Sequence, residues 1–415
     1  MQAPAATPLQ MPAPAPSPAL ATRRPLRACM LAYTFYEGDG RVIRYAQSLV
    51  RDGAQVDAIV LRRPGQVAEE VLDGVRVLRI QAREKNERGR LAYLVRLLRF
   101  FFRSMHEVAR RHRAQPYDLV HVHSVPDFEV FAALAPRLGG AQVILDLHDL
   151  VPEFYAAKFG VRPESLVFRA LERMERWSTG FADHVIVAND LWLDKIIARA
   201  APREKVSSFI NHPDLALFDP ARRTRVADGR FLLSYAGSLN WHQGLDIAIR
   251  AVAIARSQIP GLAFHIHGEG PTRQSLAALV ESLGLQDVVH LHAPLPIREI
   301  AGVMADADLG VVPKRNDAFG GEAFSTKILE FMALGVPVVV ARTRIDDHYF
   351  DESLLRFFAP GDADDLARVL VAAWQDRAGS GARARQALAH ARCNSWESRQ
   401  GRYLDLVQRL VDAPR

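Results

Sequence analysis

Short apolar runs alternate with helical patterns along almost the whole chain, and this alternation limits the possible fold more than any other feature. A first series begins near Arg27 with RACMLAYTF, AQVDAIVL, GVRVLRI, YDLVHVHS, QVILDLHD and HVIVAN. A second series begins with FLLSYAGS, LAFHIHGEG, VVHLHA, LGVVP and PVVVAR. Apolar strands separated by helices are typical of a parallel sheet covered on both faces. The sequence therefore predicts the α/β class, with two facing, Rossmann-like doubly wound domains and a cleft between them.

Composition sets the expected boundaries of these domains. Residues 1–25 are rich in Pro and Ala and contain no acidic residue, which predicts a disordered tail. We expect a first domain over 26–210, a polar linker over 211–228 and a second domain over 229–395. The last segment, 396–412, has apolar residues at helical spacing, so we expect it to pack back on the first domain.

Several classes of protein are excluded by what the sequence lacks. It has two cysteines, Cys29 and Cys393, which argues against a disulfide scaffold and favours a cytoplasmic location. It has no run of eighteen apolar residues and no signal-like apolar block near its start. GDGRVI and HGEGPT each lack the third glycine of a dinucleotide fingerprint.

No metal ion and no cofactor are expected. No group of His, Cys and Asp has zinc-like spacing. The first Asp-x-Asp pair, Asp306 and Asp308, lies at a helix–strand junction. The second, Asp362 and Asp364, matches a helix start, where carboxylates cap backbone amides.

Ligands of open parallel sheets bind beyond the carboxyl ends of the strands, so the loops that follow strands carry the candidate residues. Gly38, Asp39 and Gly40 follow the first strand and would let backbone amides approach an anion, although an ordinary surface turn is the alternative. His148 follows VILDL and could donate to a sugar hydroxyl or a phosphate, although a structural histidine is the alternative. The weaker candidates are His121, His123, Asp127 and Glu153.

The stretch EAFSTKILEFMALGVPVVV places two glutamates, Glu322 and Glu330, around the start of a helix. Ser325 and Thr326 are typical N-cap residues, so we expect the helix to begin there. Its free amides, with Lys327, would attract a diphosphate, and each carboxylate could accept from a vicinal diol. The alternative is two solvated carboxylates on an ordinary helix.

These motifs, together with GDGRVIRYAQSLVRDG, YDLVHVHSVPDF, VILDLHDLVPEFY, FINHPDLALF, SYAGSLNWHQGLDIAI and HIHGEGP, resemble the GT-B-fold retaining glycosyltransferases of glycosyltransferase family 4. The resemblance implies metal-independent transfer of a hexose from a nucleotide-diphosphate donor to a lipid-linked or saccharide acceptor. It implies catalytic roles for His148, Glu322 and Lys327. The residues it implies for donor binding are Gly38, Asp39, Gly40, Gly237, Ser238, His242, Gln243, Gly268, Ala323, Phe324, Ser325 and Glu330.

The chain departs from this family at the loop after FLLSYA. Family members carry an arginine and a lysine where this chain has Ser238 and Gln243. The available cations are then Lys327, Lys314, Arg315 and an imidazolium at His242. The departure keeps open the alternative of a membrane-associated binding protein without catalysis. A sugar-nucleotide epimerase is a further alternative, because the GT-B architecture also serves such enzymes.

Residues 88–113 form a basic amphipathic pattern. Leu91, Leu94, Leu98 and Phe102 share one helical face, with arginines between them. Such a helix can lie on an anionic membrane surface, which would place the chain at the inner face of the cytoplasmic membrane. The alternative is a helix that covers the sheet and exposes a solvated basic face. Nucleic acid is not expected as a partner, because the aromatic residues lie with the apolar face.

Overall fold

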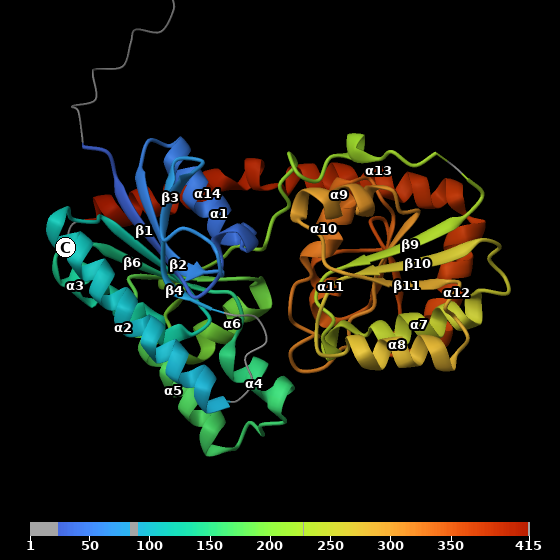
Figure 1. The fold of residues 1–415 in the computed structure, drawn as a ribbon, viewed down its shortest axis with the longest axis horizontal. Helices are drawn as coiled ribbons and strands as arrows, with labels where there is room; N and C mark the ends of the chain where they lie inside the picture. Colours follow the sequence, from blue (N-terminus) through green and yellow to red (C-terminus); the bar gives the residue numbers. More distant parts are fainter. Residues whose placement is uncertain (1–23, 84–89, 227, 414–415) are drawn as a thin grey trace, which may run out of the picture.

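The computed structural model describes residues 24–83, 90–226 and 228–413. Two α/β domains lie side by side, each built on a sheet with helices on both faces (Figure 1). The predicted tail, residues 1–25, falls outside the described residues except for its last two.

The N-terminal domain holds an eight-stranded sheet in the order β3-β4-β2-β1-β5-β6-β7-β8. Its strands are β1 (Arg27–Ala32), β2 (Gln55–Arg62), β3 (Glu69–Leu72), β4 (Val75–Ala82), β5 (Leu119–His123), β6 (Gln142–Leu147), β7 (His184–Val187) and β8 (Val206–Ser208). All neighbours are parallel except β3 and β4, which form an antiparallel hairpin. This hairpin adds an antiparallel edge to the parallel sheet predicted from the sequence, and Asp73 and Gly74 turn the chain there with positive φ angles of 48° and 81°.

Helices cover both faces of this sheet. They are α1 (Gly40–Arg51), α2 (Arg90–Ala114), α3 (Leu134–Leu138), α4 (Val151–Phe159), α5 (Leu166–Phe181) and α6 (Asp190–Arg199). The last helix of the chain, α14 (Trp396–Asp412), also packs here, against α1. The indole Nε1 of Trp396 donates to Ser48 Oγ at 2.9 Å, and the Tyr403 hydroxyl lies 2.9 Å from His121 Nδ1.

The C-terminal domain holds a six-stranded parallel sheet in the order β11-β10-β9-β12-β13-β14. Its strands are β9 (Phe231–Ala236), β10 (Leu262–His267), β11 (Val289–His292), β12 (Leu309–Val312), β13 (Val338–Ala341) and β14 (Arg356–Phe358). Its helices are α7 (Leu245–Ala255), α8 (Arg273–Ser282), α9 (Ile297–Ala305), α10 (Thr326–Ala333), α11 (Arg344–Tyr349), α12 (Ala363–Gln375) and α13 (Arg377–Cys393).

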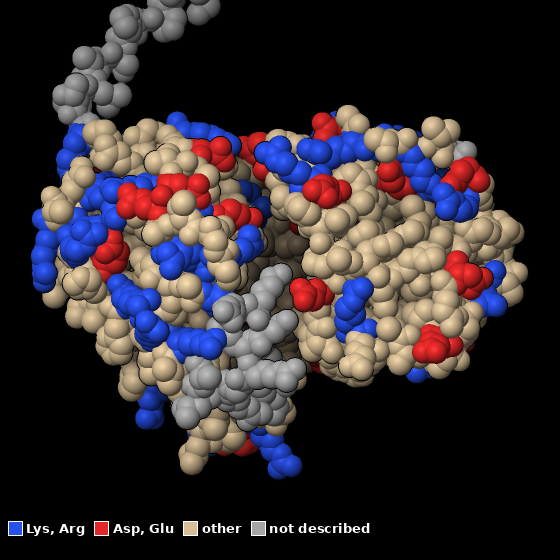
Figure 2. Space-filling model, in the orientation of Figure 1, with Lys and Arg blue, Asp and Glu red and all other residues tan. Residues whose placement is uncertain are grey.

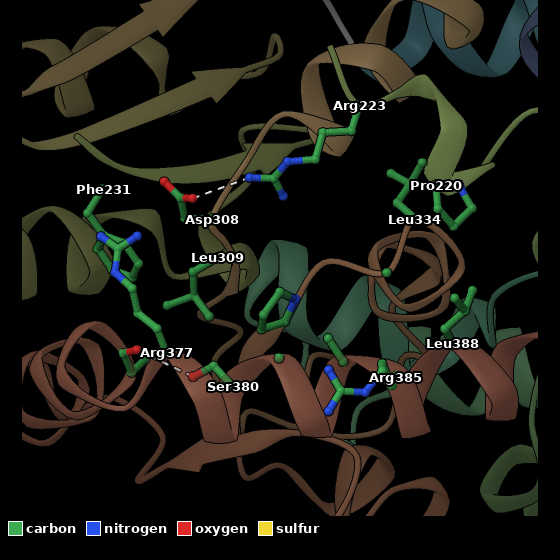
Figure 3. Close-up of a pocket in the computed structure, with 15 residues that line it drawn as sticks. Pro220, Arg223, Phe231, Asp308, Leu309, Leu334, Arg377, Ser380, Arg385 and Leu388 are labelled. Carbon is green, nitrogen blue, oxygen red and sulfur yellow. Dashed lines mark hydrogen bonds and ion pairs between the residues drawn. The ribbon is translucent and has the colours of Figure 1, made fainter. Parts of the chain in front are cut away.

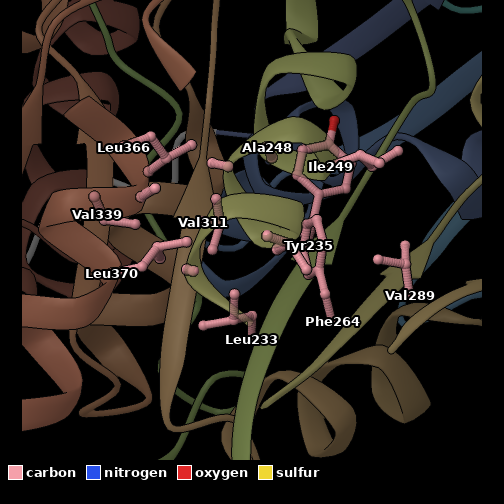
Figure 4. Packing of buried hydrophobic residues seen from close by; sticks show 14 of the residues in the cluster. Leu233, Tyr235, Ala248, Ile249, Phe264, Val289, Val311, Val339, Leu366 and Leu370 are labelled. Atoms are coloured by element: carbon pink, nitrogen blue, oxygen red, sulfur yellow. The ribbon is translucent and has the colours of Figure 1, made fainter. Parts of the chain in front are cut away.

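Two apolar layers sandwich this second sheet. Residues of α7, α8 and α12 pack on one face, around Phe264 and Val311 (Figure 4). Residues of α9, α10 and α13 pack on the other face. Burial of these layers fixes the sheet, and the sheet in turn fixes where the loops after β9, β10 and β12 begin.

Candidate functional site

Helix α10 begins without a side-chain cap. Ser325 is its N-cap residue, yet the side chain accepts no hydrogen bond from the first turn. The Ser325 Oγ atom is buried and has no hydrogen-bond partner. The first amides of a helix need acceptors and attract anions, so an uncapped start next to a buried hydroxyl is suited to an anionic ligand.

Lys327, in the first turn of α10, lies against the loop that follows β9. A side chain at Gly237 would collide with the Lys327 Cε atom, and the Lys327 Nζ atom lies 3.4 Å from Gln243 Oε1. Nζ also lies 5.2 Å from the centre of the Tyr235 ring. This cation therefore sits beside the loop in which the arginine and lysine of the family pattern are replaced by Ser238 and Gln243.

Burial lowers the pKa of Lys327 to about 8, while Glu330 opposes the shift. The amine is therefore still largely protonated at neutral pH.

The other predicted cations are engaged in holding the structure together. Lys314 is buried and donates to the Ala323 carbonyl at 2.9 Å, and its Nζ lies 2.9 Å from a carboxylate oxygen of Asp346. Arg315 pairs with Asp246 at 2.7 Å and stacks over the Trp241 ring. Neither group is placed to act as a free cation for a phosphate.

Burial disfavours the imidazolium expected at His242, because it lowers the pKa of the ring below its usual value. Its Nε2 atom lies 3.0 Å from Gln243 Nε2. Among the predicted cations, Lys327 is the one whose ammonium lies against Gly237 and Gln243 of this loop.

Glu322 lies at the junction of the two domains. Its Oε1 atom is 3.0 Å from Arg344 Nη1, and its Oε2 atom is 2.5 Å from Nζ of Lys195 on α6. The side-chain amide of Asn189 donates to the Glu322 carbonyl at 3.0 Å. The loop before α10 also inserts Phe319 against Trp192 of the N-terminal domain. The first glutamate of the motif is thus held by both domains.

Glu330, the second glutamate, faces cations from both domains. Burial raises its pKa, while Lys327 and Arg44 oppose the rise. Arg44 belongs to α1 and was not singled out from the sequence. Its guanidinium lies beside Gly40 and pairs with Asn211. The sequence did contain a signal for Arg44, because this residue lies one helical turn after Gly40 on the helix that starts at that glycine.

The loops after β1, β9 and β10, which contain Gly38 and Gly40, Gly237 and Gly268 and are called the glycine loops below, make close contacts. A side chain at Gly268 would collide with the Gly237 carbonyl, so the loops after β9 and β10 can approach only because Gly268 lacks one. In the loop after β1, Asp39 accepts from the amides of Arg41 and Val42 at 3.2 Å and caps α1. The carboxylate of Asp39 thus has a structural partner, which sequence reasoning did not anticipate.

His148 belongs to a network in the N-terminal domain. Its Nε2 atom lies 3.1 Å from His123 Nδ1 and 3.3 Å from Asp146 Oδ2. Burial opposes ionisation of Asp146, but Arg41, which grips it with two contacts of 2.7 Å, and His148 hold its pKa well below the usual range. The network orients the His148 ring.

The weaker candidates have structural partners. Glu153 is gripped by Arg199 at 2.7 and 3.0 Å. Asp127 accepts from Ser124, and burial raises its pKa to about 7.

The Asp-x-Asp pairs are structural as well. Asp308 pairs with Arg225 at 2.7 Å and lines a cavity at the starts of β9 and β12, the opposite end of the sheet from the glycine loops (Figure 3). Asp306 accepts from the amides of Thr224 and Arg225, both at 2.7 Å. Asp362 caps α12 through the Asp365 amide.

Comparison with known proteins agrees with this geometry. Residues 40–211 match the glycosyl transferase 4-like domain family, and residues 230–376 match the glycosyl transferases group 1 family. The chain belongs to the GT-B glycosyltransferases of this group 1/family 4 type.

Two curated relatives illustrate the group. A D-inositol 3-phosphate glycosyltransferase of Arthrobacter sp. is 27% identical over 322 residues, which cover 74% of each chain. The amylovoran biosynthesis glycosyltransferase AmsK of Erwinia amylovora is 29% identical over 183 residues, 44% of this chain and 45% of that one. The chain is therefore related to enzymes of exopolysaccharide biosynthesis.

Solved structures share the fold. Sucrose-phosphate synthase of Thermosynechococcus elongatus superposes with a TM-score of 0.78 at 19% identity, covering 94% of this chain and 100% of that chain. HepE of Anabaena, solved in complex with UDP, superposes with a TM-score of 0.68 at 17% identity, covering 92% and 100%.

Proposed function

We propose that the chain transfers a hexose from a nucleotide-diphosphate sugar to a lipid-linked or saccharide acceptor, with retention of configuration and without a metal ion. The observation that carries this proposal is the uncapped start of α10, set between Glu322 and Glu330 with Lys327 beside the loop after β9. The HepE complex with UDP is consistent with a nucleotide diphosphate as the ligand of such a site.

In this mechanism the residues bind and stabilise charge rather than form covalent bonds. The amides at the start of α10 and the Lys327 ammonium would stabilise the departing diphosphate, which lowers the energy of an oxocarbenium-like transition state. The acceptor hydroxyl would attack from the face that the diphosphate leaves, and a phosphate oxygen would take its proton. Glu322 would hold the sugar hydroxyls and Glu330 the ribose. The paired-carboxylate scheme of glycosidases is not required.

The exposed face of α2 supports an acceptor at a membrane surface. Leu94, Val95, Leu98 and Phe102 are 45%, 57%, 39% and 58% exposed. The helix packs on its domain through a different face, which includes Leu97, Phe100 and Val108. The side chain of Leu91 lies outside the described residues.

The apolar stripe predicted from the sequence is thus not the face that covers the sheet. Arginines lie beside it, and basic side chains run along this part of the surface (Figure 2). Exposed apolar residues among arginines suit an anionic lipid surface at the inner face of the cytoplasmic membrane. None of the described helices is long and apolar enough to cross a membrane.

The binding-only alternative rests on the missing arginine and lysine. Lys327 weakens this alternative, because it places a cation against the same loop. The epimerase alternative has no specific observation in its favour.

A donor screen tests the proposal. The full chain should be stabilised against heat by at least one uridine, guanosine or adenosine diphosphate sugar, because a ligand that binds only the folded state raises the melting temperature. The stabilising donor should then be turned over in the presence of a chelator, with the product anomer assigned by proton NMR. Absence of binding by all donors contradicts the proposal, as does inversion of the anomeric centre.

A further inference from the structure

Four histidines share one face of the C-terminal sheet at its edge. His265 and His267 lie on β10, and His290 and His292 lie on the edge strand β11. The strands pair in register, with His265 opposite His290 and His267 opposite His292. Side chains alternate between the faces of a strand, and the intervening residues Phe264, Ile266 and Val289 belong to the apolar core on the other face. The register therefore gathers all four imidazoles on one side.

Three of these rings converge on one point. One ring nitrogen from each of His265, His267 and His292 lies within 4.8 Å of the other two. The Nδ1 atom of His265 is hydrogen-bonded to Nε2 of His292 at 2.9 Å, so a metal ion bound by both nitrogens would take the place of the proton that they share. Two nitrogen ligands of a tetrahedral metal ion lie roughly 3.3 Å apart, given metal–nitrogen distances of about 2.0–2.1 Å. The spacing of the pair is close to that of two ligands of one ion.

The surroundings of the rings also disfavour the protonated form, which cannot bind a metal. Burial, with help from the neighbouring histidines, lowers the pKa of His265 and of His267 to about 4, and it lowers the pKa of His292. A neutral imidazole offers a lone pair on one ring nitrogen, which is the form in which histidine binds a metal.

His267 carries the clearest sign of a missing ligand. The residue is only 8% exposed, and its Nδ1 atom has no hydrogen-bond partner. The ring hydrogen-bonds the backbone of Ala293 instead. Histidine ligands of metals typically bind the ion through one nitrogen while the other donates to a carbonyl, which also fixes the tautomer. An unpartnered buried nitrogen otherwise costs free energy.

We propose that His265, His267 and His292 form a binding site for a divalent transition-metal ion of the Zn²⁺ class. A set of imidazoles selects Zn²⁺, Co²⁺, Ni²⁺ or Cu²⁺ over Mg²⁺ and Ca²⁺, which prefer oxygen. The fourth position is left for water or for His290, whose ring centre lies 4.9 Å from that of His265. The sequence predicts no metal site, because no single segment has zinc spacing and only the pairing of β10 with β11 assembles the ligands.

The site adjoins the glycine loops. His267 directly precedes Gly268, and its carbonyl accepts from the Gly237 amide at 2.9 Å. The His292 carbonyl accepts from the Gly268 amide at 3.4 Å. A metal ion here would tie together the strand ends from which these loops start, and would add stability rather than polarise a diphosphate. The site is independent of the proposed function.

Metal titration of the full chain, without a polyhistidine tag and stripped by a chelator, tests the site. Wild-type protein should bind one Zn²⁺ or Co²⁺ per chain, and its melting temperature should rise with Zn²⁺ concentration. His265→Gln and His292→Gln should each weaken binding by at least about tenfold. His106→Gln, which alters an exposed histidine of α2, should bind as the wild type does. Absence of stoichiometric binding, or equal affinity in all four proteins, overturns the proposal.

A footprint of the wild-type chain needs no variant and guards against misfolding. Zn²⁺ should slow the carbethoxylation of His265 and His292, measured by mass spectrometry, while His106 reacts at an unchanged rate. Mg²⁺ should protect none of them. Equal reactivity of His265 and His292 with and without Zn²⁺ contradicts the site.

Discussion

The ammonium of Lys195 and the carboxylate of Glu322 join the two domains, with Nζ 2.5 Å from Oε2. Lys195 comes from α6 of the N-terminal domain, and Glu322 precedes α10 of the C-terminal domain. Glu322 is only 8% exposed and also contacts Arg344. The glutamate proposed to hold the donor sugar is therefore also a contact between the two domains, so its carboxylate has both a proposed binding role and an interdomain partner.

Replacement of Lys195 should show whether its ion pair with Glu322 contributes to donor binding. Lys195→Met should raise the donor KM by about tenfold, because Glu322 loses the interdomain ion pair that holds its carboxylate, while the melting temperature changes little. A double-mutant cycle with Glu322→Gln should give a coupling of about 0.5–3 kcal/mol in donor binding. Lys205→Met, at a half-buried lysine elsewhere in the N-terminal domain, is the control. Strict additivity of the two changes would show that the pair has no role in binding.

Glu330→Gln should lower catalytic activity without lowering the stability of the fold. Hydrogen bonds to charged groups contribute about 1.5–3 kcal/mol, so loss of the carboxylate should lower kcat/KM at least tenfold. Glu322→Gln should act in the same direction.

The fold should tolerate the Glu330 change. Burial raises the pKa of Glu330 in the folded state, so its favourable contribution exists below the unfolded pKa and is lost as pH rises through the folded value. At pH 7 the neutral glutamine should therefore be at least as stable as the wild type in urea. Wild-type turnover, or a marked loss of stability at pH 7, is the result that contradicts this assignment.

The local motifs could be predicted from the sequence because each depends on neighbours in the chain. The start of α10 at Thr326 agrees with the position of Ser325, although the Ser325 side chain makes no capping hydrogen bond, and Asp362 caps α12 as its place before that helix predicts. The β3–β4 hairpin was missed although Asp73-Gly74 is a strong hairpin signal. Helix α13 was missed because its alanines and glycines give almost no amphipathic pattern.

Pairings between distant residues could not be predicted in this way. Lys195 meets Glu322, and Arg44 faces Glu330, only once two sheets are folded and docked. The same holds for the histidines of β10 and β11, whose convergence depends on strand register. Engagement of Lys314 with Asp346 also removes a cation that looked available in the sequence. The residue types of the site could thus be predicted from the sequence. Their partners could not, because tertiary packing determines which residues meet.

The lowered pKa of Lys327 predicts an alkaline limit to activity. The pKa falls to about 8 in the folded state, so kcat/KM should decline tenfold per pH unit above that value as the ammonium loses its proton. Lys327→Gln should be slow at all pH values and should lack this limb. Lys205→Gln removes another lysine with a lowered pKa and should keep it. A pH profile of Lys327→Gln with the wild-type limb would assign the limb to a different group.

Lys327 should also make the stability of the fold depend on pH, in a direction set by its lowered pKa. Its folded pKa is lower than its unfolded value, so the protonated form destabilises the fold. Urea stability attributable to Lys327 should rise as pH increases from about 8 toward the unfolded value, and the rise should be absent in Lys327→Gln. An equal rise in both proteins contradicts the assignment.

Helix α2 should bind anionic vesicles through its exposed face. Wild-type protein should float with vesicles containing phosphatidylglycerol and remain behind with neutral vesicles, and added salt should weaken binding because the charges are exposed. The triple change Arg96→Glu, Arg99→Glu and Arg103→Glu should abolish flotation.

Two further variants separate the contribution of charge to vesicle binding from that of apolar insertion. Leu98→Ser with Phe102→Ser should weaken flotation while leaving the basic residues intact, because these side chains are 39% and 58% exposed and would enter the lipid. The matched control changes three exposed arginines of the C-terminal domain, Arg250, Arg298 and Arg385, to glutamate. It carries the same change in net charge and should still float. Equal loss of flotation in this control would mean that net charge alone, rather than the α2 surface, governs the attraction to the vesicle.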